Sequence, residues 1–187
     1  MTAVLALFFF AAPGWTPGPS PAADFEVLTH EGKTVRFFQD LVRSKNVAVN
    51  FIFTSCRAVC PASTASFARL RTLLGTEAGV SAHLVSISVD PVRDTPAVLR
   101  AYAAKFGGAA TGWTFVTGDP QTIARLLTVL SANGAQGAPE VHARGVAVFR
   151  GSSGEWTWTS ESNSPAHIRA LLAEASVSAG LPKQAAK

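Results

Sequence analysis

The chain is short of the residues that build multi-cysteine or methionine-rich sites: its 187 residues include two Cys, one Met and four His. These counts exclude a framework of several disulfides, a zinc ribbon and a methionine-rich metal site. Charged residues make up 15% of the chain, against about 25% in a typical soluble domain. With 48% hydrophobic residues, a wholly disordered chain is also excluded, and one domain with a packed core is expected.

The positive charge is not concentrated anywhere. The chain has 16 Lys and Arg against 12 Asp and Glu, a formal net charge of +4, and its cations are scattered without a cluster. A nucleic-acid surface needs a basic patch or stripe. We therefore expect no nucleic-acid partner.

The apolar run at residues 3–12 is too short to span a bilayer, which takes about 20 residues. It fits the hydrophobic region of a secretory signal or a short anchor, although no Lys or Arg precedes Lys33 to supply the usual charged start. Four prolines and two glycines follow in residues 13–21. Residues 1–21 are therefore predicted to be a signal or short anchor with a proline-rich linker, on a protein that is exported to the periplasmic side of a membrane.

Residues 22–176 form the predicted domain, and residues 177–187 form a tail in which the apolar spacing stops. Hydrophobic periodicity, helix-capping pairs and turn residues predict the elements in order. They are a β-hairpin at 25–36, a strand at 47–53, a helix from Pro61, a strand at 83–89, a helix opened by Thr95 and Pro96, a strand at 113–117, a helix opened by Asp119 and Pro120, a hairpin at 145–159, and a helix opened by Ser164 and Pro165. This order predicts an α/β fold, a thioredoxin-like sandwich with an N-terminal β-hairpin.

Cys56 and Cys60 follow the strand at 47–53 directly and lie at the start of the first helix. The positive end of the helix and the neighbouring cation of Arg57 both favour thiolate over thiol. Four residues apart on one helical turn, the two sulfurs can form a disulfide or hold one metal ion. A buried structural pair is the plain alternative.

His142 comes three residues before the strand that begins at Gly145. If that strand lies antiparallel beside the strand at 47–53, it begins at the sheet edge where Cys56 and Cys60 lie. The other histidines do not compete, since His30 is in a hairpin turn, His83 starts a strand and His167 is on the last helix. A lone loop histidine is usually a surface residue, but beside two thiolates it becomes a candidate ligand.

Two thiolates and one imidazole are a soft donor set that suits copper, with zinc as the main competitor. Structural zinc usually takes four protein ligands, and three are on offer here. Asp90 ends the second parallel strand at the same edge. It is a candidate for supporting a metal ligand by a hydrogen bond or for acting as a weak extra ligand, or it is simply the residue that fixes the turn before Pro91. Asp94 and Thr95 are predicted to cap the helix that follows.

These residues resemble the Sco/SenC family of copper-delivery proteins. The likeness rests on Phe53–Cys56 with Cys60–Pro61, then Ser88–Pro96, then His142, and it covers residues 22–175. The family usually has Pro where this chain has Arg57, and often a polar context where this chain has Val141 and Ala143. The three ligand positions are intact.

The resemblance implies that Cys56, Cys60 and His142 bind one copper ion per chain for assembly of the copper centre of cytochrome c oxidase or a related cuproprotein. Its partners would be a copper-acceptor subunit of a respiratory oxidase, together with a thiol reductant or copper donor. Two other functions stay open. The same cysteines suit a thiol-disulfide oxidoreductase acting on partner proteins, and a binding module with a structural disulfide would use neither thiolate nor imidazole.

Overall fold

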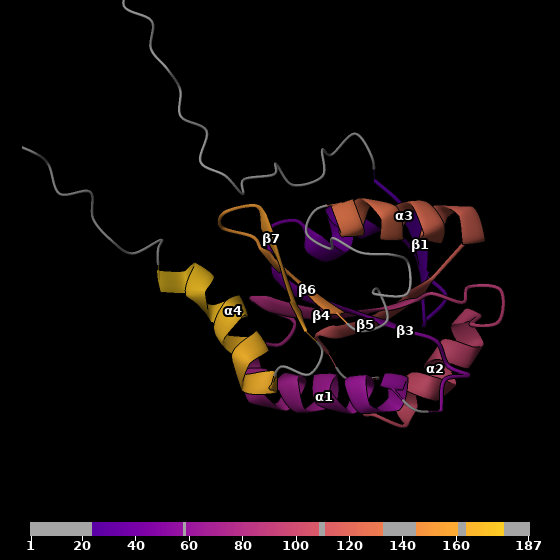
Figure 1. The fold of residues 1–187 in the computed structure, drawn as a ribbon, viewed down its shortest axis with the longest axis horizontal. Helices are drawn as coiled ribbons and strands as arrows, with labels where there is room; N and C mark the ends of the chain where they lie inside the picture. The colour runs from indigo at the N-terminus through magenta and orange to yellow at the C-terminus, as the bar shows by residue number, and fades with distance from the viewer. Residues whose placement is uncertain (1–23, 58, 109–110, 133–144, 161–163, 178–187) are drawn as a thin grey trace, which may run out of the picture.

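The computed structural model describes residues 24–57, 59–108, 111–132, 145–160 and 164–177 (Figure 1). Its elements are β1 (Glu26–Thr29), β2 (Thr34–Arg36), the π-helix η2 (Phe37–Val42), β3 (Asn46–Ile52), α1 (Val59–Leu74), the 3₁₀ turn η3 (Gly75–Glu77), β4 (Ala82–Ser88), α2 (Pro96–Ala104), β5 (Trp113–Thr117), α3 (Pro120–Ala132), β6 (Gly145–Arg150), β7 (Glu155–Ser160) and α4 (Pro165–Val177). Among the described residues, none of the helices combines the length and apolar character that crossing a bilayer requires.

Within the described ranges, one mixed sheet of seven strands organises the domain, in the order β2-β1-β5-β4-β3-β6-β7. The three central strands β3, β4 and β5 are parallel, and the β1–β2 and β6–β7 hairpins add antiparallel strands on either side. The predicted pairing of β6 with β3 is confirmed, with Val146 opposite Asn50. Consequently β6 begins at the edge where β3 ends, as the sequence argument required.

The sheet is covered on both faces, and β3 shows how the sequence divides between them. Ala48 and Ile52 pack in the core that α1, α2 and α4 cover, whereas Val47, Val49 and Phe51 pack in the core under α3 and η2 (Figure 1). Because successive strand residues point to opposite faces, a continuous apolar run can serve both layers. Packing on both faces of the sheet therefore fixes the position of β3, and Cys56 and Cys60 follow directly after this strand.

The predicted helix starts are confirmed for α2 and α3. The Oγ1 of Thr95 accepts a hydrogen bond from the Val98 N–H at 3.4 Å, and a carboxylate oxygen of Asp119 accepts one from the Thr122 N–H at 2.9 Å. Helix α1 begins two residues earlier than predicted, at Val59, so that Pro61 is its third residue. Proline is tolerated there because the first-turn N–H groups have no partner within the helix.

A buried polar network joins α1 to the centre of the sheet. The amide of Asn50 donates to the Ser63 Oγ at 3.2 Å and accepts from the Ser86 Oγ at 2.6 Å, and the indole N–H of Trp113 donates to the same Ser86 oxygen at 3.0 Å. Burying polar groups of this kind costs free energy unless they are hydrogen-bonded. The network therefore favours a single packing arrangement of α1 on β3 and β4.

Gly145, the first residue of β6, lets an aromatic ring cross the strand. A Cβ on Gly145 would lie 2.9 Å from the ring of Trp158, which stacks on Phe51 with centroids 5.6 Å apart and planes 6° from parallel. Trp158 of β7 thus reaches over β6 to β3. A side chain at position 145 would separate these rings.

Candidate thiol and metal site

Cys56 and Cys60 lie together at the carboxyl edge of the parallel strands. Cys56 follows β3 in a turn that closes with a 3.1 Å hydrogen bond from its own N–H to the Phe53 carbonyl. Cys60 is the second residue of α1, and its N–H donates to the Cys56 sulfur at 3.4 Å. A backbone N–H directed at sulfur, at the positive end of a helix, favours the thiolate form of Cys56.

The two cysteines differ in exposure. Cys60 is 1% exposed and belongs to the core under α1, whereas Cys56 is partly exposed at its margin. Access controls which sulfur meets a partner first. Cys56 is therefore the sulfur that a partner thiol or an incoming ion reaches from solvent, and Cys60 is the sulfur behind it.

Thr64 and Tyr102 support Cys60 from within the core. The Thr64 Oγ1 donates to the Cys60 carbonyl at 2.7 Å and lies 2.9 Å from the Tyr102 hydroxyl, so the Tyr102 O–H donates to Thr64. Burial raises the pKa of Tyr102, and the negative charges of Cys60, Cys56 and Asp94 raise it further. The phenol accordingly stays a neutral hydrogen-bond donor beside the two sulfurs.

Asp94 has a different role from the predicted one. Its carboxylate does not cap α2, because Thr95 is the N-cap; it accepts hydrogen bonds from Thr54 and Ser88 instead. The prediction of a capping Asp94 is therefore wrong. The sequence signal was ambiguous, since an aspartate directly before a Thr-Pro pair looks like part of the cap, and the true partner Thr54 is 40 residues away.

Asp90 and Arg57 are the two candidate auxiliary residues near this edge. The Asp90 carboxylate accepts a 2.8 Å hydrogen bond from Arg93, and its side chain is 20% exposed. Arg57 is exposed. A role for either residue beside a metal stays a prediction.

His142 lies outside the described residues. Two of the histidines that were set aside take part in packing elsewhere: the ring of His30 packs edge-on against Phe115, and His83 meets the Thr114 hydroxyl at 2.9 Å. Within the part of the chain that the structure describes, no three His, Cys, Asp or Glu side chains are grouped closely enough to hold a metal ion.

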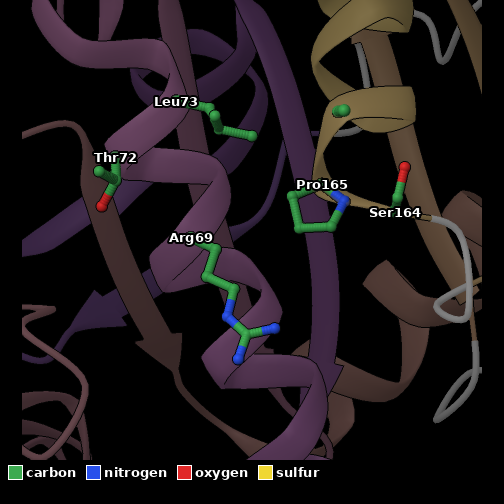
Figure 2. Close-up of a pocket in the computed structure, with 6 residues that line it drawn as sticks. Arg69, Thr72, Leu73, Ser164 and Pro165 are labelled. Carbon is green, nitrogen blue, oxygen red and sulfur yellow. The ribbon is translucent and has the colours of Figure 1, made fainter.

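A groove of about 420 Å³ lies between α1 and the start of α4, apart from the cysteines. Figure 2 shows Arg69, Thr72 and Leu73 on α1, with Ser164 and Pro165 across the groove. Its lining residues include no carboxylate, imidazole or thiol. The groove therefore holds none of the side chains expected to bind copper.

Comparison with known proteins gives a consistent match. Residues 16–153 match the SCO1/SenC family model. The SCO1 protein homolog of Bacillus subtilis is 30% identical over 126 residues, which are 65% of this chain and 64% of that protein. The chain thus spans just under two thirds of the length of that relative, and 46% of a SCO2-like protein of Rickettsia felis.

Solved structures show the same architecture. A SCO1/SenC family lipoprotein from Bacillus anthracis is 25% identical, with a TM-score of 0.66 over 84% of this chain and 94% of that one. Bradyrhizobium japonicum ScoI, solved with copper bound, is 24% identical, with a TM-score of 0.65 over 81% of this chain and 97% of that one. The fold is therefore the predicted thioredoxin-like sandwich, and with the family model matching residues 16–153, the chain belongs to the SCO1/SenC family.

Proposed function

We propose that this protein is a metallochaperone that binds one copper ion through Cys56, Cys60 and His142 and delivers it to a cuproprotein such as cytochrome c oxidase. The observation that carries the proposal is the closeness of Cys56, in the turn after β3, to Cys60, the second residue of α1, whose N–H donates to the Cys56 sulfur at 3.4 Å. Two sulfurs held close together at a sheet edge can bind one ion and release it by ligand exchange.

The donor set supports copper as the cargo. Thiolates are soft ligands that prefer Cu(I), and both the helix terminus and the N–H donated to Cys56 favour the thiolate that binding requires. Cys56 is partly exposed, which gives an ion a route in and out. Bradyrhizobium japonicum ScoI and yeast Sco1 were both solved with copper bound.

His142 is proposed as the third ligand. The support is indirect: β6, which begins three residues after it, starts at the edge where β3 ends, with Val146 opposite Asn50. His83 meets Thr114 near the start of β4 and β5, and the ring of His30 packs against Phe115 of β5, which β4 separates from β3. A third donor would complete a site that the two sulfurs leave open.

A thiol-disulfide oxidoreductase is the second candidate function. It is favoured by the same pair, since a partly exposed Cys56 backed by a buried Cys60 is the arrangement in which one thiolate attacks and the other resolves. A structure of the family member BsSco is described as revealing a disulfide switch. This function would need no imidazole.

Location and partners follow from the proposed cargo. The apolar run at residues 3–12 supports export to the periplasmic side, with residues 1–21 as signal or anchor, 22–176 as the copper domain and 177–187 as tail; the Bacillus anthracis relative is a lipoprotein. We propose a copper-acceptor subunit of a respiratory oxidase or another cuproprotein as receiver, and a thiol reductant or copper donor upstream. BsSco is described as belonging to a family of cytochrome c oxidase assembly proteins.

The variant His142→Ala separates the two functions. Copper delivery predicts that it weakens Cu(I) binding severely, measured by competition with a chelator under anaerobic conditions. Its Cys56–Cys60 reduction potential should stay near that of the wild type, because a disulfide needs only two sulfurs at a workable separation. Thermal unfolding of the same variant controls for folding. Unchanged copper affinity would remove His142 from the ligand set, and a redox activity on partner thiols without copper binding would favour the oxidoreductase.

A further inference from the structure

Asp94 is a buried carboxylate in the turn between β4 and α2, and it lies where the β3–β4 ladder stops. The last bond along that ladder runs from the Val89 N–H to the Ile52 carbonyl at 2.8 Å. Among the described residues, no further strand pairs with the chain between Ile52 and Cys56. Asp94, only 1% exposed, lies at this point and bonds to the segment that follows Ile52.

Three hydrogen bonds converge on this one carboxylate. Its Oδ2 accepts from the Thr54 N–H at 3.0 Å and from the Ser88 Oγ at 2.6 Å, and its Oδ1 accepts from the Thr54 Oγ1 at 2.5 Å. Thr54 is two residues before Cys56, and Ser88 is the last residue of β4. Asp94 therefore fastens the segment that leads to Cys56 onto the end of the neighbouring strand.

Within the described part of the chain, neither α2 nor an ion pair explains the burial of this carboxylate. Thr95 caps the helix, and Arg93 forms its ion pair with Asp90. A buried carboxylate is costly unless its acceptor capacity is used, and an apolar side chain would fill the same space more cheaply. The benefit of Asp94 therefore lies in the two groups that it holds together.

The position of Thr54 bears on both sulfurs. Thr54 lies inside the turn closed by the bond from the Cys56 N–H to the Phe53 carbonyl, and the Cys56 sulfur in turn accepts from the Cys60 N–H. If Thr54 moves, the turn moves, and the Cys56 sulfur shifts relative to the first turn of α1. We propose that Asp94 is a positioning residue, whose buried carboxylate sets the placement of Cys56 against Cys60. Where copper is concerned, the proposal rests on the function proposed above; where the disulfide is concerned, it does not.

The test compares Asp94→Ala with Asp94→Asn. Alanine removes all three bonds. Asparagine keeps them, because its oxygen can accept from the Thr54 N–H and Ser88 while its NH₂ donates to the Thr54 hydroxyl, which accepts as readily as it donates. Two quantities are measured on the full chain: the equilibrium constant of the Cys56–Cys60 disulfide in a glutathione buffer, where oxidised glutathione takes the two electrons, and the Cu(I) affinity.

For Asp94→Ala we expect the Cu(I) affinity to fall by about tenfold or more, in line with losses seen when a residue that orients a metal ligand is removed. The disulfide equilibrium constant should also fall, because the two sulfurs are no longer held in place. Asp94→Asn should restore both. Ser88→Ala removes one of the three bonds and should lower both quantities by a smaller amount. This variant replaces Asp94→Ala in the test if Asp94→Ala does not fold.

Two controls separate positioning from loss of stability. Leu126→Ala opens the fully buried core on the opposite face of the sheet, and Asp119→Ala removes an aspartate–backbone bond at the next strand-to-helix corner, that of β5 and α3. Both should lower the unfolding temperature without changing the disulfide equilibrium. Equal effects of Asp94→Ala and Leu126→Ala on that equilibrium would overturn the proposal, as would an Asp94→Asn variant that behaves like alanine. A wild type that binds no Cu(I) would refute the proposed function, while the glutathione measurement would still decide the role of Asp94.

Discussion

Protonation of His83 is predicted to destabilise the fold as the pH falls from about 6.5 to about 4. His83 is the second residue of β4, and its Nε2 lies 2.9 Å from the Thr114 hydroxyl of β5. Burial lowers its pKa from 6.5 to about 4, with a smaller contribution from the positive charge of Lys45. His83 therefore binds a proton more weakly in the folded state than in the unfolded chain.

The sign and size follow from proton linkage. Above pH 6.5 the imidazole is neutral in both states and the full stability is present; as the pH falls towards 4, the unfolded state binds the proton first and stability is lost. With a folded pKa of about 4 and an unfolded value of 6.5, the loss is roughly 2 kcal/mol at pH 5. That is a large fraction of the stability of an ordinary domain.

The assay is urea denaturation at a series of pH values between 7 and 4. His83→Gln cannot take up the proton but can still bond to Thr114, so its unfolding free energy should fall less than that of the wild type. His167→Gln, which changes an exposed histidine of α4, is the control and should follow the wild type. The pKa of His30 is also lowered by burial, so part of the slope will remain in His83→Gln. Parallel curves for wild type and His83→Gln would refute the reasoning.

Two further predictions concern the edge where the cysteines lie. Arg57→Ala should slow alkylation of Cys56 by iodoacetamide near neutral pH, since the variant loses a cation that favours the thiolate; an unchanged or faster rate would remove Arg57 from the mechanism. Gly145→Ala should lower the unfolding free energy by about 1–3 kcal/mol in chemical denaturation, because its Cβ would lie 2.9 Å from the Trp158 ring. An unfolding free energy of Gly145→Ala equal to that of the wild type would show that the packing of the Trp158 ring does not require glycine at position 145.

Local sequence patterns predicted most of the fold because the signals they use act over a few residues. The Thr95–Pro96 and Asp119–Pro120 pairs mark helix starts by their own chemistry, and both starts are confirmed. The start of α1 was missed by two residues because Pro61 is compatible with several positions in a first turn. The partner of the N-terminal hairpin was not predicted at all, since nothing local in β1 specifies that it pairs with β5.

The parts of the site that depend on local spacing or on strand order could be predicted from the sequence. The four-residue spacing predicted that Cys56 and Cys60 lie close together, and the Cys60 N–H donates to the Cys56 sulfur. The prediction that they share a helical turn is wrong, because α1 begins at Val59 and Cys56 lies in the turn before it. The link from Asp94 to Thr54 could not be predicted, because it joins residues 40 positions apart and depends on how two strand ends align. The placement of His142 is a prediction that depends on the confirmed pairing of β6 with β3.

The central claim, that Cys56 and Cys60 together hold a copper ion, is tested most directly by anaerobic titration of the reduced protein with Cu(I) against a competing chelator. The account predicts one tightly bound copper per chain in the wild type and loss of that affinity in both Cys56→Ser and Cys60→Ser, because a hydroxyl cannot replace a soft thiolate donor. One-to-one binding retained in either single variant would contradict it.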